Sequence, residues 1–426
     1  SYLLGLCVLL GGLCACTDAP SLVGNVYETV DPPPVTEVVP DEPPLIPRED
    51  IVLTKGEAAI AAGNNAFAFD LLRTVAKGEE AGTNLLVSPL SASLALAMLN
   101  NGANDATQEE IQQALGYGDA TREDMNSYFR KIVTAMREID TRATFESANS
   151  IWIANNFPVL APFRELNQTY YDAEVGNVDF TDAATCGLIN DWCKEKTHGL
   201  IPELLDGLDP ATLMCLVNAL YFKASWSNHF EKSLTQKAPF HNQSGKVATV
   251  DMMKGWISGF YLKEDAFELA ELPYGNGAFG MVFLLPAAGV SPATVLENLN
   301  ATVWENSLSK MYGTTVNIYL PRFKVEYKRT LNNDLQALGM TSMFGGDADF
   351  SLLSPYGSGV STVLQKTFLD VYEEGTEGAA ATAIILVGSS GESAPIPVIE
   401  LNRPFIYFIK EKSTGNVFFA GIVQNL

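Results

Sequence analysis

The sequence is poor in the residues that most catalytic and metal sites need. Only three histidines occur among 426 residues, His198, His229 and His241, and none has the spacing of metal ligands. The patterns G-x-S-x-G, G-x-x-x-x-G-K-[ST] and H-E-x-x-H, which mark common hydrolase, phosphate-binding and zinc sites, are all absent. We therefore expect a protein that is not an enzyme and that carries no metal and no cofactor.

Positive charge is also scarce. Lysine and arginine number 27 against 50 aspartates and glutamates, which gives a formal net charge of −23. A polyanion of this kind repels nucleic acid and anionic membrane surfaces. We expect no nucleic-acid partner and a monomeric chain.

Cysteine is sparse, and half of the six cysteines lie in the first sixteen residues. The other three are Cys186, Cys193 and Cys215, an odd number that cannot pair completely. Cys186 and Cys193 are two helical turns apart, roughly 10 Å, which is too far for a disulfide. Buried thiols are the expected state.

The first stretch, SYLLGLCVLLGGLCAC at residues 1–16, is apolar but too short to span a bilayer as a helix. It is typical of a secretory signal, and we expect it to be incomplete at its start. Its end, Leu13 to Cys16, resembles the bacterial lipobox, which implies that Cys16 is lipidated and anchors the chain in a bacterial cell envelope, facing the periplasm or the outside. An ordinary cleaved signal peptide is the alternative.

Proline is concentrated in one place. Residues 17–50 include DPPPVTEVVPDEPPLIPRED, in which prolines and acids dominate, so this segment is expected to be an extended spacer. Residues 51–426 contain no second linker and no repeat of 20–50 residues, which predicts a single domain.

Helical patterns come first in this domain and strand patterns later, an order that favours an α+β fold. Ser88 and Pro89 are expected to cap and begin a helix over 88–103. The last strand pattern should form a hairpin that turns at Ser413–Asn416. Further helices are expected over 64–78 and 121–139, and strands over 143–155, 211–226, 277–286, 314–328 and 367–372.

One stretch near the end, EEGTEGAAATAI from Glu373 to Ile384, fits both a loop and a strand. Neighbouring side chains of a strand face opposite sides of the sheet, and every second residue from Thr376 to Ile384 is uncharged. No proline occurs from Glu374 to Ala394, so nothing would prevent insertion into a sheet. A Gly/Ala linker is the alternative, but the apolar residues 384–387 are poorly suited to a solvated role.

Five further blocks, in this order along the chain, carry a resemblance to a known family. They are NLLVSPLSASLALAMLNNGA, LVNALYFKASWSNHF, LPYGNGAFGMVFLLP, LPRFKVEYKRTLNNDLQALGMTSMFGGDADFSLLS and LNRPFIYFIKEKSTGNVFFAGIV. Together with the stretch at 373–384 they resemble the serpins in their inhibitory form. The resemblance implies an α+β serpin fold, with three β-sheets surrounded by about nine helices and an exposed reactive loop.

The resemblance also implies a function. Inhibitory serpins are suicide inhibitors of serine or cysteine endopeptidases: the protease cleaves the loop, the loop inserts into the large sheet as a strand, and the acyl-enzyme is trapped. The expected partner is then a target protease in a covalent complex. The chain is expected to contact a membrane only through its lipid anchor. The alternative is a non-inhibitory serpin that acts as a binding module, whose hinge would carry proline or charge in the inserting positions.

Site residues follow from the family's spacing. The reactive bond is expected between Ser389 and Ser390, within a window of small residues that favours elastase-like or subtilisin-like targets; cleavage after Glu392 by a glutamate-specific protease is a further option. The rest of the window is Gly388, Gly391 and Ser393, and the hinge is Glu373, Glu374, Gly375, Thr376, Glu377, Gly378, Ala379, Ala380, Ala381 and Thr382.

Two regions that control sheet opening are implied as well. Ser88 and Asn218 match the family's shutter, whose histidine is replaced here by Gln365, a residue that can hydrogen-bond but cannot titrate. Trp226 matches the breach at the top of the sheet, and Arg322 is expected to pair there with Glu373.

Overall fold

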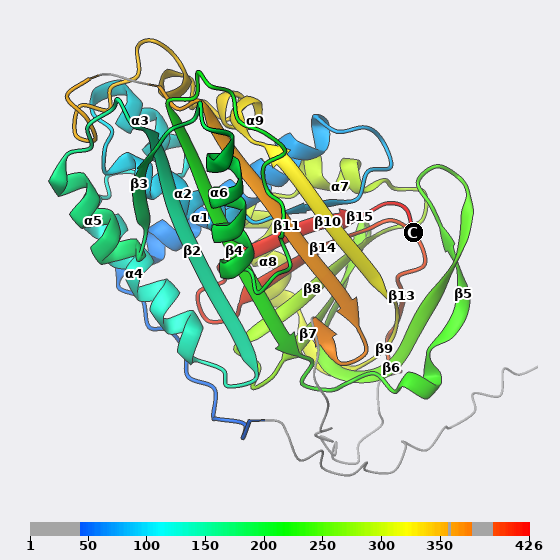
Figure 1. Cartoon of the computed structure of the whole chain (residues 1–426). Helices are drawn as coiled ribbons and strands as arrows, with labels where there is room; N and C mark the ends of the chain where they lie inside the picture. The colour runs from blue at the N-terminus through cyan, green and yellow to red at the C-terminus, as the bar shows by residue number, and fades with distance from the viewer. Residues whose placement is uncertain (1–42, 357–358, 377–394) are drawn as a thin grey trace, which may run out of the picture. The chain divides into compact units, whose positions relative to one another are not determined.

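The computed structural model describes residues 43–356, 359–376 and 395–426. In these ranges six of the nine helices come before β5, where they alternate with four strands, and most of the strands come later (Figure 1). Nine α-helices lie in these ranges, namely α1 (Lys55–Lys77), α2 (Pro89–Asn100), α3 (Asp105–Ala114), α4 (Arg122–Glu138), α5 (Ala161–Tyr171), α6 (Ala183–Lys196), α7 (Pro292–Asn298), α8 (Ala301–Lys310) and α9 (Asn332–Ala337), with two 3₁₀ turns, η1 (Lys232–Leu234) and η2 (Ser342–Phe344).

Local sequence explains where several helices begin. Thr54 and Glu57 form a reciprocal capping box at the start of α1, and Thr121 and Asp124 do the same for α4. Helix α2 begins at Pro89, as the sequence indicated, but the Ser88 side chain does not cap it. The Ser88 hydroxyl instead donates to the carbonyl of Phe418, 2.8 Å away, so this serine connects the helix start to the core strands.

A nine-stranded sheet forms the larger network, with β5 pairing only with β6. Its path is β1-β15-β14-β8-β7-β6-β9-β13. The strands are β1 (Leu85–Val87), β5 (Gln236–His241), β6 (Val247–Lys263), β7 (Phe267–Tyr274), β8 (Phe279–Pro286), β9 (Tyr312–Pro321), β13 (Val398–Glu400), β14 (Phe405–Glu411) and β15 (Val417–Val423). The hairpin of β14 and β15 turns where the sequence predicted.

The second sheet has six strands in the order β10-β11-β12-β4-β2-β3. Its strands are β10 (Phe323–Thr330), β11 (Thr362–Tyr372), β12 (Gly375–Thr376), β4 (Met214–Ser225), β2 (Ala143–Ala154) and β3 (Glu174–Val178). Helix α6 lies in front of this sheet (Figure 1), and its residues Trp192 and Cys193 join a small apolar cluster with the sheet face. The main core lies on the other side of the sheet and extends through the larger network.

The α+β serpin architecture is therefore confirmed. The three sheets implied by the resemblance are connected into two hydrogen-bonded networks, because the 17-residue strand β6 is long enough to pair with β5, β7 and β9. The strand pattern at 314–328 is divided at Arg322, which sends β9 and β10 to different sheets. In the part of the chain that the structure describes, no helix is long and apolar enough to cross a membrane.

Candidate functional site

The stretch singled out in the sequence enters the six-stranded sheet. The chain leaves β11 at Tyr372, turns through Glu373 and Glu374, and returns as β12 between β11 and β4 (Figure 1). In this antiparallel register Thr376 lies opposite Val371 of β11 and opposite Ala224 of β4. Two of the predicted hinge residues, Gly375 and Thr376, therefore already form a short central strand.

Below β12 the two neighbouring strands are not paired with each other. β11 and β4 meet directly only at the far end, where residues 362–364 pair in parallel with 215–217. Between that end and β12, the described chain places no strand between residues 365–370 of β11 and residues 218–223 of β4. A cavity of only about 10 Å³ remains there, bordered by side chains such as Leu220 and Phe368. Side chains therefore close the gap between these stretches of β11 and β4, and no backbone ladder of the described chain does so. We call this gap the open ladder.

Glu373 fixes the turn that leads into β12. Its carboxylate is 1% exposed and accepts hydrogen bonds from Nε of Arg322 at 2.9 and 2.8 Å and from Nη2 at 2.6 Å. The Thr235 hydroxyl donates to the same carboxylate at 2.5 Å. Burial alone would raise the pKa of Glu373, but these hydrogen bonds outweigh it and lower the pKa. The carboxylate is therefore held ionised at the turn.

Gly375 is the residue that lets the chain pass between the strands. Its φ is +153°, and a Cβ at this position would overlap the carbonyl oxygen of Ala224 and crowd Cα of Ser225. Only glycine combines this backbone conformation with so close an approach.

We expect Gly375→Ala to lower the free energy of unfolding of the uncut protein by about 2–4 kcal/mol, because the added methyl group would push β12 away from β4. Denaturant unfolding of the purified variant measures this. The matched control is Gly187→Ala in α6, where an added Cβ meets nothing within 4 Å. An equal loss of stability in both variants would contradict the steric argument.

An aromatic pair supports the buried side chain of Thr376. The Thr376 hydroxyl lies 2.6 Å from the hydroxyl of Tyr274, and the Tyr274 ring stacks on Trp226 at 4.3 Å. The indole N–H of Trp226 donates to the Tyr372 carbonyl at 2.9 Å, and its backbone N–H donates to the Glu374 carbonyl at 2.9 Å. Trp226 thus holds the chain on both sides of the turn.

At the other end of the open ladder, Gln365 and Asn218 lie next to the last paired row of β11 and β4. The Gln365 side chain accepts from the Ser88 N–H and donates to the Ser88 carbonyl, both at 2.9 Å. Asn218 accepts from the Ser91 hydroxyl and donates to the side chain of Asn149. β11 is thus hydrogen-bonded through Gln365 to Ser88, and β4 through Asn218 to Ser91. Gln365 and Asn218 make no hydrogen bond to each other.

A partly buried histidine that follows β4, His229, gives a pH prediction. Burial lowers the pKa of His229 to about 4, so this ring is neutral in the folded protein well below its usual pKa. The unfolded chain binds this proton below about pH 6.5, so His229 should remove roughly 3 kcal/mol of stability as the pH falls from about 6.5 to 4. Urea unfolding at pH 7, 5.5 and 4.5 should show a shallower acid dependence in His229→Gln; equal slopes would contradict this.

The remaining predicted residues lie outside the described part of the chain. They are Cys16, the hinge residues 377–382, and the reactive-bond window 388–393. Conversely, Tyr274, Thr235 and Ser91 contact the predicted residues but were missed. Nothing in their local sequence marks them, since each acts through a partner more than a hundred positions away.

Comparison with known proteins gives the family. The family model described as "Serpin (serine protease inhibitor)" matches residues 62–426. Leukocyte elastase inhibitor of Sus scrofa is 35% identical over 378 residues, covering 85% of this chain and 98% of that protein, and Iripin-2 of Ixodes ricinus is 33% identical, covering 87% and 94%. The solved structure of the thermophilic serpin Tengpin in the native state has a TM-score of 0.79 and 32% identity, covering 90% and 97%.

The chain belongs to the serpin family. Serpins as a family are protease inhibitors and not enzymes, in agreement with the scarcity of catalytic motifs.

Proposed function

We propose that this chain is a suicide inhibitor of serine endopeptidases with elastase-like or subtilisin-like specificity. The protease serine attacks the carbonyl carbon of Ser389, and the peptide nitrogen of Ser390 leaves with a proton. The loop then extends β12 through the six-stranded sheet while the protease remains attached as an ester. A cysteine protease would form the corresponding thioester.

The observation that supports this proposal is the register of β12. In this antiparallel register, each step forward along the loop corresponds to one step back along β11 and along β4. Residue 377 would therefore lie opposite Asp370 and Lys223, and residue 382 opposite Gln365 and Asn218. Six added residues therefore complete the open ladder, and the predicted hinge ends at residue 382. Further insertion would require the parallel pairing of 362–364 with 215–217 to break.

Side-chain alternation supports the same extension. Thr376 faces the core beside Tyr274, so residues 378, 380 and 382 would face the core as well. These are glycine, alanine and threonine, which are small enough to be buried without charge. The single charge in the added stretch, at Glu377, would face the opposite side of the sheet.

The target class follows from the residues around the proposed bond. Val387, Gly388 and Ser389 fit a narrow specificity pocket, and no lysine or arginine occurs from Glu377 to Leu401 for a trypsin-like protease. A glutamate-specific protease would instead cut after Glu392.

The test is to mix the chain with pancreatic and neutrophil elastase, subtilisin, trypsin and a glutamate-specific protease. We expect a complex with an elastase or with subtilisin that survives boiling in detergent, and a released peptide that begins at Ser390. Cleavage by every protease without a complex would reject trapping and favour a binding module. A complex with trypsin alone would reject the proposed specificity.

We further propose that Cys16 carries a lipid that anchors the domain through the spacer of residues 17–50. This rests on the lipobox-like residues 13–16. Expression in a bacterial host with a radiolabelled fatty acid should label the chain, and Cys16→Ala should abolish the label and move the protein to the soluble fraction. An unlabelled wild-type chain would reject the anchor.

A further inference from the structure

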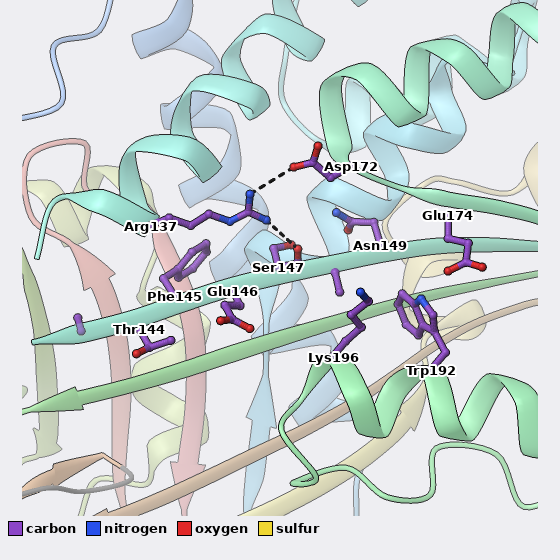
Figure 2. A pocket seen from close by; sticks show the side chains of 12 residues that line it. Arg137, Thr144, Phe145, Glu146, Ser147, Asn149, Asp172, Glu174, Trp192 and Lys196 are labelled. Atoms are coloured by element: carbon purple, nitrogen blue, oxygen red, sulfur yellow. Dashed lines mark hydrogen bonds and ion pairs between the residues drawn. The ribbon is translucent and has the colours of Figure 1, made fainter. Parts of the chain in front are cut away.

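A cavity of about 530 Å³ lies beside β2, between α4 and α6 (Figure 2). Its lining carries three acids and two cations, and the chain itself occupies most of these charges. Arg137 pairs with Asp172 at 3.2 Å, and Glu146 bonds to His198 at 2.8 Å. These contacts leave one acid and one lysine of opposite charge, so the cavity favours neither cations nor anions.

The sheet formed by β6, β9 and β13 has one buried face and one exposed face. Val316 and Ile318 of β9 are fully buried, so alternation turns the side chain of Asn317 between them to the opposite face. Trp256 of β6 and Val398 of β13 lie directly beside Asn317, and they are 36% and 50% exposed. Large apolar side chains that are exposed side by side mark an interaction surface.

Two rows of side chains cross the three strands on this exposed face. They are Trp256, Asn317 and Val398 in one row, and Lys254, Tyr319 and Glu400 in the next. We call these six residues the outer face. Ile396, two residues before Val398, adds a further apolar side chain that is 50% exposed. The outer face is therefore mostly aromatic and aliphatic, with one cation and one anion.

The two charges of the outer face lie on opposite margins. The Lys254 ammonium, on the β6 side, lies over the rings of Trp256 and Tyr319, at 4.8 and 5.3 Å from their centroids. Glu400, on the β13 side, is exposed and accepts a hydrogen bond from Asn402 at 3.1 Å. Two strand spacings, roughly 10 Å, separate these margins. Neither charged side chain makes an ion pair with a described residue, so each can pair with a partner.

This arrangement is complementary to itself. A two-fold axis parallel to β9 places the β6 margin of one copy over the β13 margin of a second copy, without a shift along the strands. Lys254 of each copy then lies over Glu400 of the other copy, and Trp256 lies over Val398 of the other copy. The two sheets pack face to face with nearly aligned strands, which is a usual geometry for packed sheets.

We propose that the outer face binds a second copy of this chain in a two-fold symmetric dimer. Six residues a side are fewer than the roughly 20–30 of a standard interface, so the dimer is weak, with a dissociation constant on the order of 0.1 mM. The net charge of −23 on each copy also opposes association over longer distances. This proposal replaces the expectation of a monomeric chain, which was based on net charge.

The test is analytical ultracentrifugation of the full chain in about 0.15 M salt, at protein concentrations up to roughly 0.5 mM. We expect the average mass to rise toward that of a dimer and no further, because a two-fold contact closes on itself. Lys254→Glu and Glu400→Lys should each weaken the dimer at least about fivefold, since each variant places like charges opposite one another in two symmetric pairs. Trp256→Ala should weaken the dimer by a similar factor.

Mixing the two charge variants gives the sharpest test. In the mixed dimer both pairs again have opposite charges, so the mixture should dimerise within about twofold of the wild type although neither variant does so alone. Lys246→Glu, in the turn before β6, is the matched control for the change in net charge and should dimerise as the wild type does. The proposal is overturned if the wild type stays monomeric at the highest concentration, if its mass grows beyond a dimer, or if the mixture dimerises no better than its components. No protease takes part, so the result does not depend on whether the chain inhibits one.

Discussion

Cutting the peptide bond between Ser389 and Ser390 should raise the melting temperature of the chain by about 10 °C or more. The open ladder between residues 365–370 of β11 and 218–223 of β4 can accept six more residues after β12. Added residues form two new ladders and bury small side chains. A net gain of about 8 kcal/mol or more corresponds to a shift of this size, because the melting temperature of a domain as long as residues 51–426 moves by roughly 1.3 °C per kcal/mol.

The measurement is calorimetry of the intact chain and of the chain cut once in the loop, with the site of cutting verified by mass spectrometry. The control is a chain cut at the same bond that carries Ala380→Arg, in which a charged side chain opposes insertion. That protein should keep the melting temperature of the uncut chain. If the wild type gains nothing on cutting, the uncut fold is not metastable and trapping loses its driving force.

The alternation of small and uncharged residues from Thr376 was visible in the sequence because a strand imposes a period of two on every residue in it. The same local logic identified the start of α2 and the hairpin of β14 and β15. The family blocks supplied the rest of the architecture, including the approach of Arg322 to Glu373. Each of these features is encoded in neighbouring residues or in a sequence block that the family shares.

The contacts that fix the hinge could not be predicted in this way. Tyr274 reaches Thr376, and Thr235 reaches Glu373, across more than a hundred residues, and no period in the sequence connects them. The sequence predicts Ser88 as a helix cap, but the Ser88 hydroxyl donates a hydrogen bond to the Phe418 carbonyl in the core and makes no capping bond to α2. The extent of β3 along β2 could not be predicted either, because a strand pattern leaves the ends of a strand open by a few residues.

Ala380→Arg should convert the chain from an inhibitor into a substrate. Residue 380 would lie opposite Thr367 of β11 and Leu220 of β4 if β12 were extended, with its side chain facing the core. Both neighbours are less than 10% exposed, so an arginine there would bury an unpaired charge at a cost of several kcal/mol. The stable complex on denaturing gels should disappear while the loop is cut at an undiminished rate.

Thr376 is a less informative position for this test, because its side chain is already buried beside Tyr274 in the uncut chain and an arginine there would disturb the starting fold. The matched control is Glu377→Arg. Residue 377 would face outward next to Asp370, so a charge of either sign should be tolerated and the complex should still form. If Ala380→Arg and Glu377→Arg trap the protease equally well, the face on which a loop side chain lies does not affect trapping. The loop then does not enter the sheet in the register of β12. Loss of trapping in the first variant alone would tie inhibition to the face of the strand that the sequence keeps free of charge.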